Sequence, residues 1–270
     1  MCFVGLWFLG IFMCCGEALD NQPLARSPSE SLGCVHIPAG FKAEIVACEP
    51  LIESPVAFEW GADGRLWVVE MRDYPSTATN VFMTNRAEHG VDYGLRYSRL
   101  LNRTGGGSGR IVALEDTHGD GVYDKAVVFL DGLDYPNGIC PWRNGVMVSA
   151  GGEIFYAEST DGTGKANVRK TILSGFNPGN PQHRVNGFDY GLDNWLYAAN
   201  GDSGGRIRSY AGGQTTMMGG CDLRFRPDTG EFDLQAGTSQ YGRHRDDWGN
   251  WFGNQNVAWL WHYCVPLPYL

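Results

Sequence analysis

A loop rich in oxygen-bearing side chains is the first candidate for chemistry in this sequence of 270 residues. Residues 116–124 read DTHGDGVYD, which puts side chains with ligand atoms at alternate positions around a glycine turn. Calcium, a hard cation, needs several oxygen ligands in such an arrangement. The alternative is a hairpin turn closed by side chains that accept backbone hydrogen bonds. The candidate calcium ligands are Asp116, His118, Asp120 and Asp124.

The segment of residues 182–202, QHRVNGFDYGLDNWLYAANGD, is the second candidate. Histidine exchanges protons near neutral pH and is the commonest general base in enzymes. His183 is therefore a candidate base, and Asp202 a candidate carboxylate that orients it. The alternative for His183 is a hydrogen-bonded structural histidine at the inner edge of a sheet, and for Asp202 a turn residue or a cation ligand.

The same segment resembles a stretch of the soluble quinoprotein sugar dehydrogenases of the glucose and sorbosone dehydrogenase type. In that family a histidine is followed by glycine, aspartate, an apolar-tyrosine strand and a Gly-Asp pair at fixed spacing. His183, Gly191, Asp193, Leu196–Tyr197 and Gly201–Asp202 fall on those positions without a gap. The resemblance implies that His183 removes a sugar hydroxyl proton while hydride passes to pyrroloquinoline quinone (PQQ). It also implies a partner that accepts electrons, such as a cytochrome.

The resemblance further implies that basic and amide side chains hold the cofactor, because PQQ has three carboxylates that need basic partners. The candidate cofactor contacts are Arg184, Asn186, Arg243 and Arg245. The alternative for Arg184 and Asn186 is that they fix their strand. Quinoproteins carry an Arg-Asn pair shortly before a glycine of a later repeat, whereas here Thr238 and Ser239 stand at those positions before Gly242.

Most of the chain after the N-terminal segment also resembles the planctomycete and verrucomicrobial membrane-bound dehydrogenase domain family. The matching segments are PSESL at 28–32, AGFKAEIV at 39–46, EPL at 49–51, DGRLWVVEM at 63–71, the Tyr-Pro pair at 74–75, the Asp-Gly loops and residues 186–204. This resemblance implies the same quinoprotein-like oxidation of a sugar or another alcohol.

An internal repeat indicates the fold class. Residues 110–133 align without gaps on residues 153–176, an offset of 43 positions. Repeats of this length are typical of solenoids and propellers. In each copy two apolar stretches flank a turn rich in glycine and polar residues, which predicts a hairpin. The expected strands are residues 111–114 with 126–130, and residues 154–157 with 170–173.

A turn pair followed by an apolar strand recurs four times, at residues 63–67, 144–148, 193–197 and 248–252. With 38 glycines and 13% aromatic residues, the chain is typical of many short strands joined by tight turns. We therefore expect an all-β fold, a β-propeller over residues 39–270, with about four to five blades of a six-bladed ring and an incomplete C-terminal end. Residues 74–109 are expected to be an insertion between blades, and the aromatic-rich residues 248–261 to lie in the core.

The N-terminal residues 1–18 are almost entirely apolar and polar sequence follows, which predicts a signal peptide and then a linker over residues 19–38. We expect a periplasmic or secreted protein. An uncleaved N-terminal segment is the alternative and the one membrane contact expected. A net charge of −9 argues against nucleic acid as a partner. The cysteines have no CxxC spacing, so zinc and covalent haem find no support, and Cys34 with Cys48 is the nearest pair for a disulfide.

The sequence thus predicts an exported quinoprotein-like oxidoreductase that acts on a sugar or another alcohol. One alternative is a non-catalytic, calcium-stabilised propeller that binds carbohydrate or protein. Another is a metal-dependent lactonase, a class that needs Glu, Asn and Asp side chains around one central cation. Fold resemblance alone does not separate these functions.

Overall fold

The computed structural model describes residues 26–72, 74, 107–177 and 180–270, and the chain divides into two compact units, residues 1–45 and 46–270. Within its described residues the first unit contains the short helix α1 (Pro28–Leu32). Ser27 caps this helix because its hydroxyl accepts the N–H of Glu30, while the Glu30 carboxylate accepts the N–H of Ser27 at 2.9 Å. The predicted signal peptide lies outside the described residues. No helix in the described ranges is long and apolar enough to cross a membrane.

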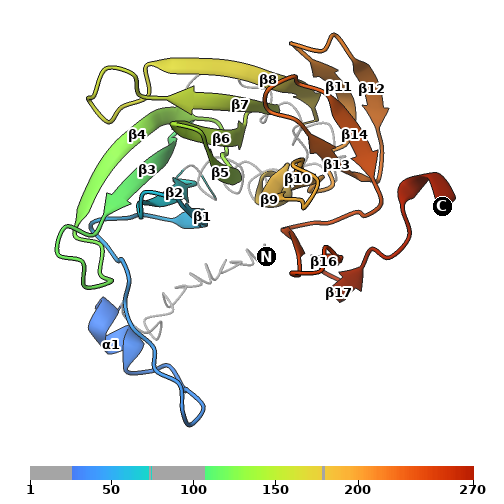
Figure 1. The fold of residues 1–270 in the computed structure, drawn as a ribbon. Helices are drawn as coiled ribbons and strands as arrows, with labels where there is room; N and C mark the ends of the chain where they lie inside the picture. Colours follow the sequence, from blue (N-terminus) through green and yellow to red (C-terminus); the bar gives the residue numbers. More distant parts are fainter. Residues whose placement is uncertain (1–25, 73, 75–106, 178–179) are drawn as a thin grey trace, which may run out of the picture. The chain divides into compact units, whose positions relative to one another are not determined.

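The second unit consists of antiparallel sheets, which confirms the all-β prediction (Figure 1). Sheet 1 contains β1 (Pro55–Trp60), β2 (Leu66–Glu70), β3 (Gly109–Glu115) and β4 (Lys125–Leu133). Sheet 2 contains β5 (Gly138–Trp142), β6 (Gly145–Ala150), β7 (Glu153–Glu158) and β8 (Val168–Phe176). Sheet 3 contains β9 (Asn186–Tyr190), β10 (Leu196–Ala199), β13 (Asp222–Phe225) and β14 (Phe232–Gln235). Sheet 4 contains β15 (Arg243–Arg245), β16 (Trp251–Gln255) and β17 (Ala258–His262).

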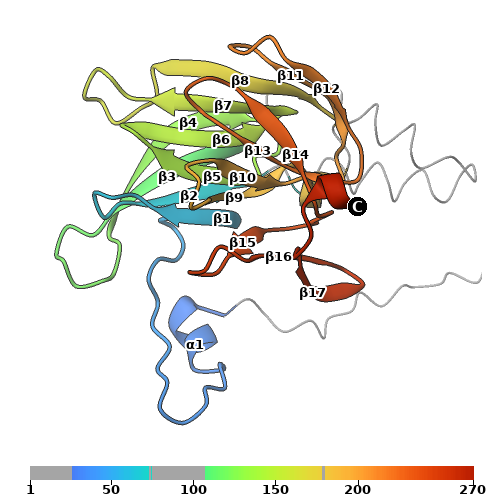
Figure 2. The ribbon, with the colours of Figure 1, turned by 45° about the vertical axis from the view of Figure 1, so that its right-hand side comes forward.

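Each sheet is a meander, in which consecutive strands pair with one another. A hairpin of β11 (Gly205–Ser209) and β12 (Thr215–Met218) interrupts sheet 3 between β10 and β13 and extends sheet 2, because β11 pairs with β8. Two short 3₁₀ helices, Pro181–His183 and Leu267–Tyr269, complete the regular structure of the described residues. Figure 2 shows the same sheets from a second direction, with the β11–β12 hairpin beside β8.

The predicted hairpins are confirmed: β3 pairs with β4 and β7 with β8. Each of the four recurring turn pairs stands directly before the second strand of one sheet, namely β2, β6, β10 or β16. The expectation for residues 74–109 is wrong in one respect. Strands β2 and β3 pair with each other, so the insertion lies inside sheet 1 and not between two sheets. Most of that segment, residues 75–106, lies outside the described part of the chain.

Sheet 2 is buried on both faces because its alternate side chains enter two different cores. Val146, Val148 and Phe155 share one cluster with side chains of sheet 1, including Trp67. Met147, Ile154 and Tyr156 share another with side chains of sheet 3. Successive residues of a strand point to opposite faces, so one strand can contribute to both cores. Strand β6 is accordingly buried along its whole length.

The aromatic-rich residues 248–261 were expected to lie in the core, but several of them are exposed. Trp251 stacks on Tyr197 with ring centroids 3.9 Å apart, but Trp248 and Trp259 are 83% and 92% exposed. Trp259 belongs to β17, whose only partner strand among the described residues is β16. An edge strand of this kind can pair with a further strand.

The meander topology sorts the loops onto two ends of the sheets. The site end, as we call it, carries the loops that enter the first strand of a sheet and those that join second to third strands. Its described loops include residues 134–137, 151–152, 180–185, 200–204, 236–242 and 256–257. The turn end carries the other connections, including residues 116–124 between β3 and β4. The predicted calcium loop and His183 therefore lie at opposite ends.

A fully buried carboxylate, Asp222 on β13, ties the loops of the site end together. Its Oδ1 accepts the N–H groups of Asn200 at 2.9 Å and Ser239 at 3.1 Å. Its Oδ2 accepts the Ser239 hydroxyl at 2.6 Å and Nη1 of Arg243 at 2.8 Å, and Arg243 is itself only 2% exposed. Burial raises the pKa of Asp222, and the Arg243 charge opposes that rise. Strands β10, β13 and β15 thus meet at a single ion pair.

Replacing Asp222 by Asn should destabilise the protein severely, because it leaves the buried Arg243 charge without a counter-ion. Removing one partner of a buried pair typically costs about 3–5 kcal/mol. The measurement is the free energy of unfolding in urea. The control is Asp228→Asn, which breaks an exposed pair with Arg143 and should cost less than about 1 kcal/mol. Equal losses in the two variants would contradict the central role of Asp222.

Candidate functional site

His183 ends a 3₁₀ turn in the loop between β8 and β9, at the site end of the sheets. Its side chain is 16% exposed. Nδ1 lies 3.3 Å from the carbonyl oxygen of Gly201 and 3.3 Å from Oδ2 of Asp202. Since both neighbours are acceptors, Nδ1 carries the proton and Nε2 presents the lone pair. The structure therefore brings the predicted pair, His183 and Asp202, together.

The lone pair on Nε2 of His183 faces amide groups. Nδ2 of Asn180 lies 2.8 Å away, within hydrogen-bond distance, and Nε2 of Gln240 lies 3.5 Å away. Gln240 also reaches Oδ2 of Asp202 at 3.4 Å. Sequence reasoning missed both residues. Asn180 caps the 3₁₀ turn that ends at His183, and an Asn-Pro pair before a turn could have indicated it.

A close backbone approach requires glycine at position 201. Gly201 has φ of +60°, and a Cβ there would lie 2.0 Å from the carbonyl oxygen of His183 and 2.2 Å from that of Arg184. Only glycine fits such a position. Asp202 also has a positive φ, 56°, which is unusual for a residue with a side chain. Unusual backbone conformations of this kind are common at functional sites, and here the conformation places the Asp202 carboxylate beside His183.

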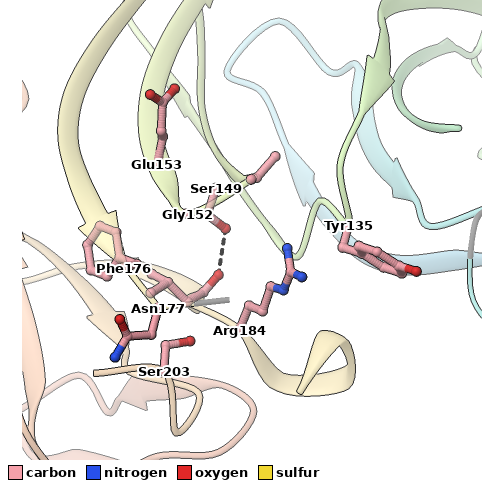
Figure 3. A pocket seen from close by; sticks show the side chains of 11 residues that line it. Tyr135, Ser149, Gly152, Glu153, Phe176, Asn177, Arg184 and Ser203 are labelled. Atoms are coloured by element: carbon pink, nitrogen blue, oxygen red, sulfur yellow. Dashed lines mark hydrogen bonds between the residues drawn. The ribbon is translucent and has the colours of Figure 1, made fainter. Parts of the chain in front are cut away.

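Arg184, the next residue, is 5% exposed and lines a separate pocket at the site end. Figure 3 shows its side chain reaching into this pocket beside Tyr135 and the Gly152 turn. Nη1 lies 3.3 Å from Oδ2 of Asp134, and the guanidinium carbon lies 4.9 Å from the centre of the Tyr135 ring. The pocket is lined by Tyr135, Ser149, Ala150, Gly151, Gly152, Glu153, Phe176, Asn177, Arg184, Val185 and Ser203.

The other predicted cofactor contacts point elsewhere. Asn186 is fully buried and bridges loops, donating to the carbonyl oxygens of Arg184 at 2.6 Å and Gln240 at 3.0 Å. Arg243 is held by Asp222 and by the carbonyl oxygen of Ala236. Arg245 donates to the carbonyl oxygens of Tyr190 and Asp246. These three side chains hold backbone and core in place, and among the described residues they do not meet His183.

The predicted calcium loop uses its own oxygens to close the turn. Asp116 accepts the N–H groups of the four residues from His118 to Gly121. Asp124 accepts the N–H and the hydroxyl of Thr117 and lies 2.5 Å from Nδ1 of His118. These hydrogen bonds lower the pKa of Asp116 and of Asp124. Among the described residues, Asp120 accepts a hydrogen bond only from the N–H of Val122.

The first strands of three sheets bring charged side chains near one another. His244 on β15 lies 3.5 Å from Oδ2 of Asp189 on β9, and this contact raises the pKa of His244. The negative charge of Glu59 on β1 also raises the pKa of His244. Burial raises the pKa of Glu59 itself.

In the described ranges no three His, Cys, Asp or Glu side chains form a group that could hold a metal ion. All five described cysteines, Cys34 and Cys48 among them, are free.

Calcium binding at residues 116–124 stays a prediction, and it can be tested by melting. A ligand that binds only the folded state raises the melting temperature in proportion to the logarithm of its excess. If the loop binds calcium, the ion should raise Tm, a chelator should reverse the rise, and Asp120→Ala should abolish the response. Asp161→Ala in the corresponding loop of the second repeat is the control. Identical calcium responses in Asp120→Ala and the parent would rule this loop out.

The His244–Asp189 contact predicts a pH-dependent contribution to stability. The folded-state pKa of His244 lies above its ordinary value of 6.5, so the contact stabilises the fold most at pH below that value and less as pH rises through the folded-state pKa. NMR titration of His244 should give a pKa above 6.5 in the parent protein and a lower one in Asp189→Asn. The carboxylate of Glu59 remains in the variant, so part of the rise should survive. An unchanged titration would contradict the contact.

The comparisons with known proteins identify a family and not an activity. No curated protein matches the chain. Residues 27–270 match a family described as a domain of unknown function, DUF7133. The match spans both described units, including the sheets and every residue of the site end. The chain therefore belongs to the DUF7133 family.

Proposed function

We propose that this chain is a quinoprotein-like oxidoreductase that takes the proton from a hydroxyl group of a sugar or another alcohol, with His183 as the base. The observation that carries the proposal is the polarised histidine. Nδ1 faces two acceptors, Gly201 and Asp202, which leaves the basic lone pair on Nε2. An alcohol oxidation needs such a base, because the proton must leave the hydroxyl oxygen as hydride passes from the carbon that bears it to a two-electron acceptor of the quinone class.

We further propose that the four sheets are consecutive blades of a β-propeller. The first strands of neighbouring sheets contact one another in order, β1 with β5, β5 with β9 and β9 with β15. Sheets 1 and 2 share one hydrophobic core across their faces, and sheets 2 and 3 share another. The Tyr241 hydroxyl, in the loop before β15, donates to the carbonyl oxygen of Val56 on β1 at 2.7 Å. In a propeller this contact would run between blades across the central channel.

The chain's own residues suffice for the proton transfer. A substrate hydroxyl that displaced the Asn180 amide from Nε2 of His183 would meet the free lone pair within hydrogen-bond distance. As Nε2 takes the proton, the ring becomes a cation. The Asp202 carboxylate stabilises that cation through Oδ2, 3.3 Å from Nδ1, and Gln240 donates to the same oxygen at 3.4 Å. Asp202 acts through His183 and is a positioning residue.

The described residues do not fit a cofactor with three carboxylates. Of the three arginines expected to grip PQQ, Arg243 is paired with Asp222, and Arg245 donates to backbone oxygens. In the described part of the chain Arg243 keeps a single buried donor without a partner, Nε, whereas Arg184 keeps both Nε and Nη2 without one. One guanidinium is too little for three carboxylates. The proposal therefore rests on the proton-abstracting half of the reaction.

A second candidate function is a non-catalytic, calcium-stabilised propeller that binds carbohydrate or protein. One observation favours it: Nε2 of His183, the atom that a base must present, already lies 2.8 Å from the Asn180 amide. A histidine satisfied on both nitrogens is what a structural role requires. Export to the periplasm or beyond is part of both proposals.

Replacing His183 by Gln separates the two functions. Gln retains hydrogen-bonding groups near both ring positions, so the fold and Tm should change little. A base contributes about 10²–10⁴-fold to rate, and the oxidation of sugars or alcohols in the presence of added PQQ and a redox dye should fall by that factor. Dye reduction and a thermal melt, measured on one preparation, give both values.

The matched control is His36→Gln, an exposed histidine of the first unit that should leave both values unchanged. Unfolding of His183→Gln would support the structural reading of the residue. Absence of dye reduction in the parent protein with any sugar or alcohol would favour the non-catalytic propeller.

A further inference from the structure

The Arg184 guanidinium is buried, and two of its three nitrogens have no hydrogen-bond partner among the described residues. Arg184 is 5% exposed, and the two nitrogens are Nε and Nη2. The hydroxyl of Ser203, which lines the same pocket and is 6% exposed, also has none in the described ranges. An unsatisfied buried polar group costs about 1–3 kcal/mol, and more when it is charged. Three such donors in one pocket indicate a missing acceptor.

The vacant atoms define the shape of that acceptor. Nε and Nη2 lie on one edge of the guanidinium, and their N–H bonds point the same way. Such an edge matches the two oxygens of a carboxylate, which it binds through two parallel hydrogen bonds. A hydroxyl or a single carbonyl would fill only half of the edge.

The guanidinium is fixed before any ligand arrives. Nη1, at its other end, lies 3.3 Å from Asp134, and the Tyr135 ring lies against it with the guanidinium carbon 4.9 Å from the ring centre. Tyr135 has a φ of 45°, a strained value for a bulky residue, so its placement beside Arg184 has an energetic cost. A preorganised donor loses less entropy on binding than a free one.

The other charges of the pocket are already paired. Asp134 is opposite Arg184, and Glu153 lies 3.3 Å from Arg169. The pocket therefore has no surplus negative charge to repel an anion. Its net charge before binding is near zero, so selectivity must come from the vacant guanidinium edge and the Ser203 hydroxyl, and not from a general positive potential.

We propose that this pocket binds the carboxylate of a small organic acid, with Arg184 gripping both oxygens and Ser203 donating a further hydrogen bond. The acid is a sugar acid or a similar small hydroxy acid, because the vacant edge matches one carboxylate. The site does not require His183 to act as a base. It can be tested by binding alone.

The test compares D-glucuronate with D-glucose by isothermal titration calorimetry on the full chain. The two sugars differ at C6, where glucuronate carries the carboxylate. Glucuronate should bind and glucose should bind at least about tenfold more weakly, the discrimination that one charge-assisted hydrogen bond provides.

Arg184→Lys tests the bidentate grip. Lysine keeps the charge opposite Asp134 but has no fork, so binding of the carboxylate should weaken by about 10- to 100-fold. Ser203→Ala keeps the guanidinium and should weaken binding less, with little loss in Tm. Arg208→Gln, at an exposed arginine of β11, is the control for a change in charge and should bind like the parent.

Two results would overturn the proposal. One is equal affinity for glucuronate and glucose in the parent, or an affinity for glucuronate that neither Arg184→Lys nor Ser203→Ala changes. The other is a crystal structure, grown with glucuronate, in which an ordered water alone joins Nε and Nη2 of Arg184 to Ser203. If Arg184→Lys fails to fold, the Ser203→Ala titration decides.

Discussion

The burial of Asp222 is the constraint on which the site end depends. A carboxylate with no exposure to water must have all its hydrogen bonds supplied by the protein, and here they come from two loops and one strand. The same loops carry the functional groups. Asn200 precedes Gly201 and Asp202, and Ser239 precedes Gln240. A shift of Asp222 would therefore move the neighbours on both sides of His183.

The two buried arginines of the site end differ in how fully their hydrogen-bond donors are satisfied. Arg243 meets a carboxylate and a carbonyl oxygen and is surrounded by the rings of Tyr197, Trp251 and Tyr263. Only its Nε lacks a partner among the described residues. Arg184 keeps a whole edge vacant beside a pocket. A buried ion pair holds elements together, whereas a buried charge with vacant donors is a cost that a ligand can remove. The contrast separates a structural arginine from a binding one.

The sequence predicted the sheets well because local patterns encode them. The 43-residue repeat and the four turn pairs marked strands that the structure contains, since a tight turn needs particular residues and a buried strand needs apolar ones. The His183–Asp202 pair was also predicted, because both residues lie in one short segment. Asp134, Gln240 and Asp222 were missed. Their partners lie 50, 57 and 21 residues away, and no local pattern indicates contacts made between sheets.

His183 and Arg184 are adjacent in sequence, but their side chains face different parts of the structure. Arg184 has extended backbone angles, φ −70° and ψ 178°, and successive side chains of an extended segment point to opposite sides. His183 faces the loops at Gly201 and Gln240, while Arg184 faces Asp134 and Tyr135 from the loop between sheets 1 and 2. The carbonyl oxygens of both residues lie against Gly201, so the backbone of residues 183–184 packs closely on that glycine. One short loop therefore supplies the proposed base to one side and the proposed carboxylate site to the other, and a change in its backbone would disturb both.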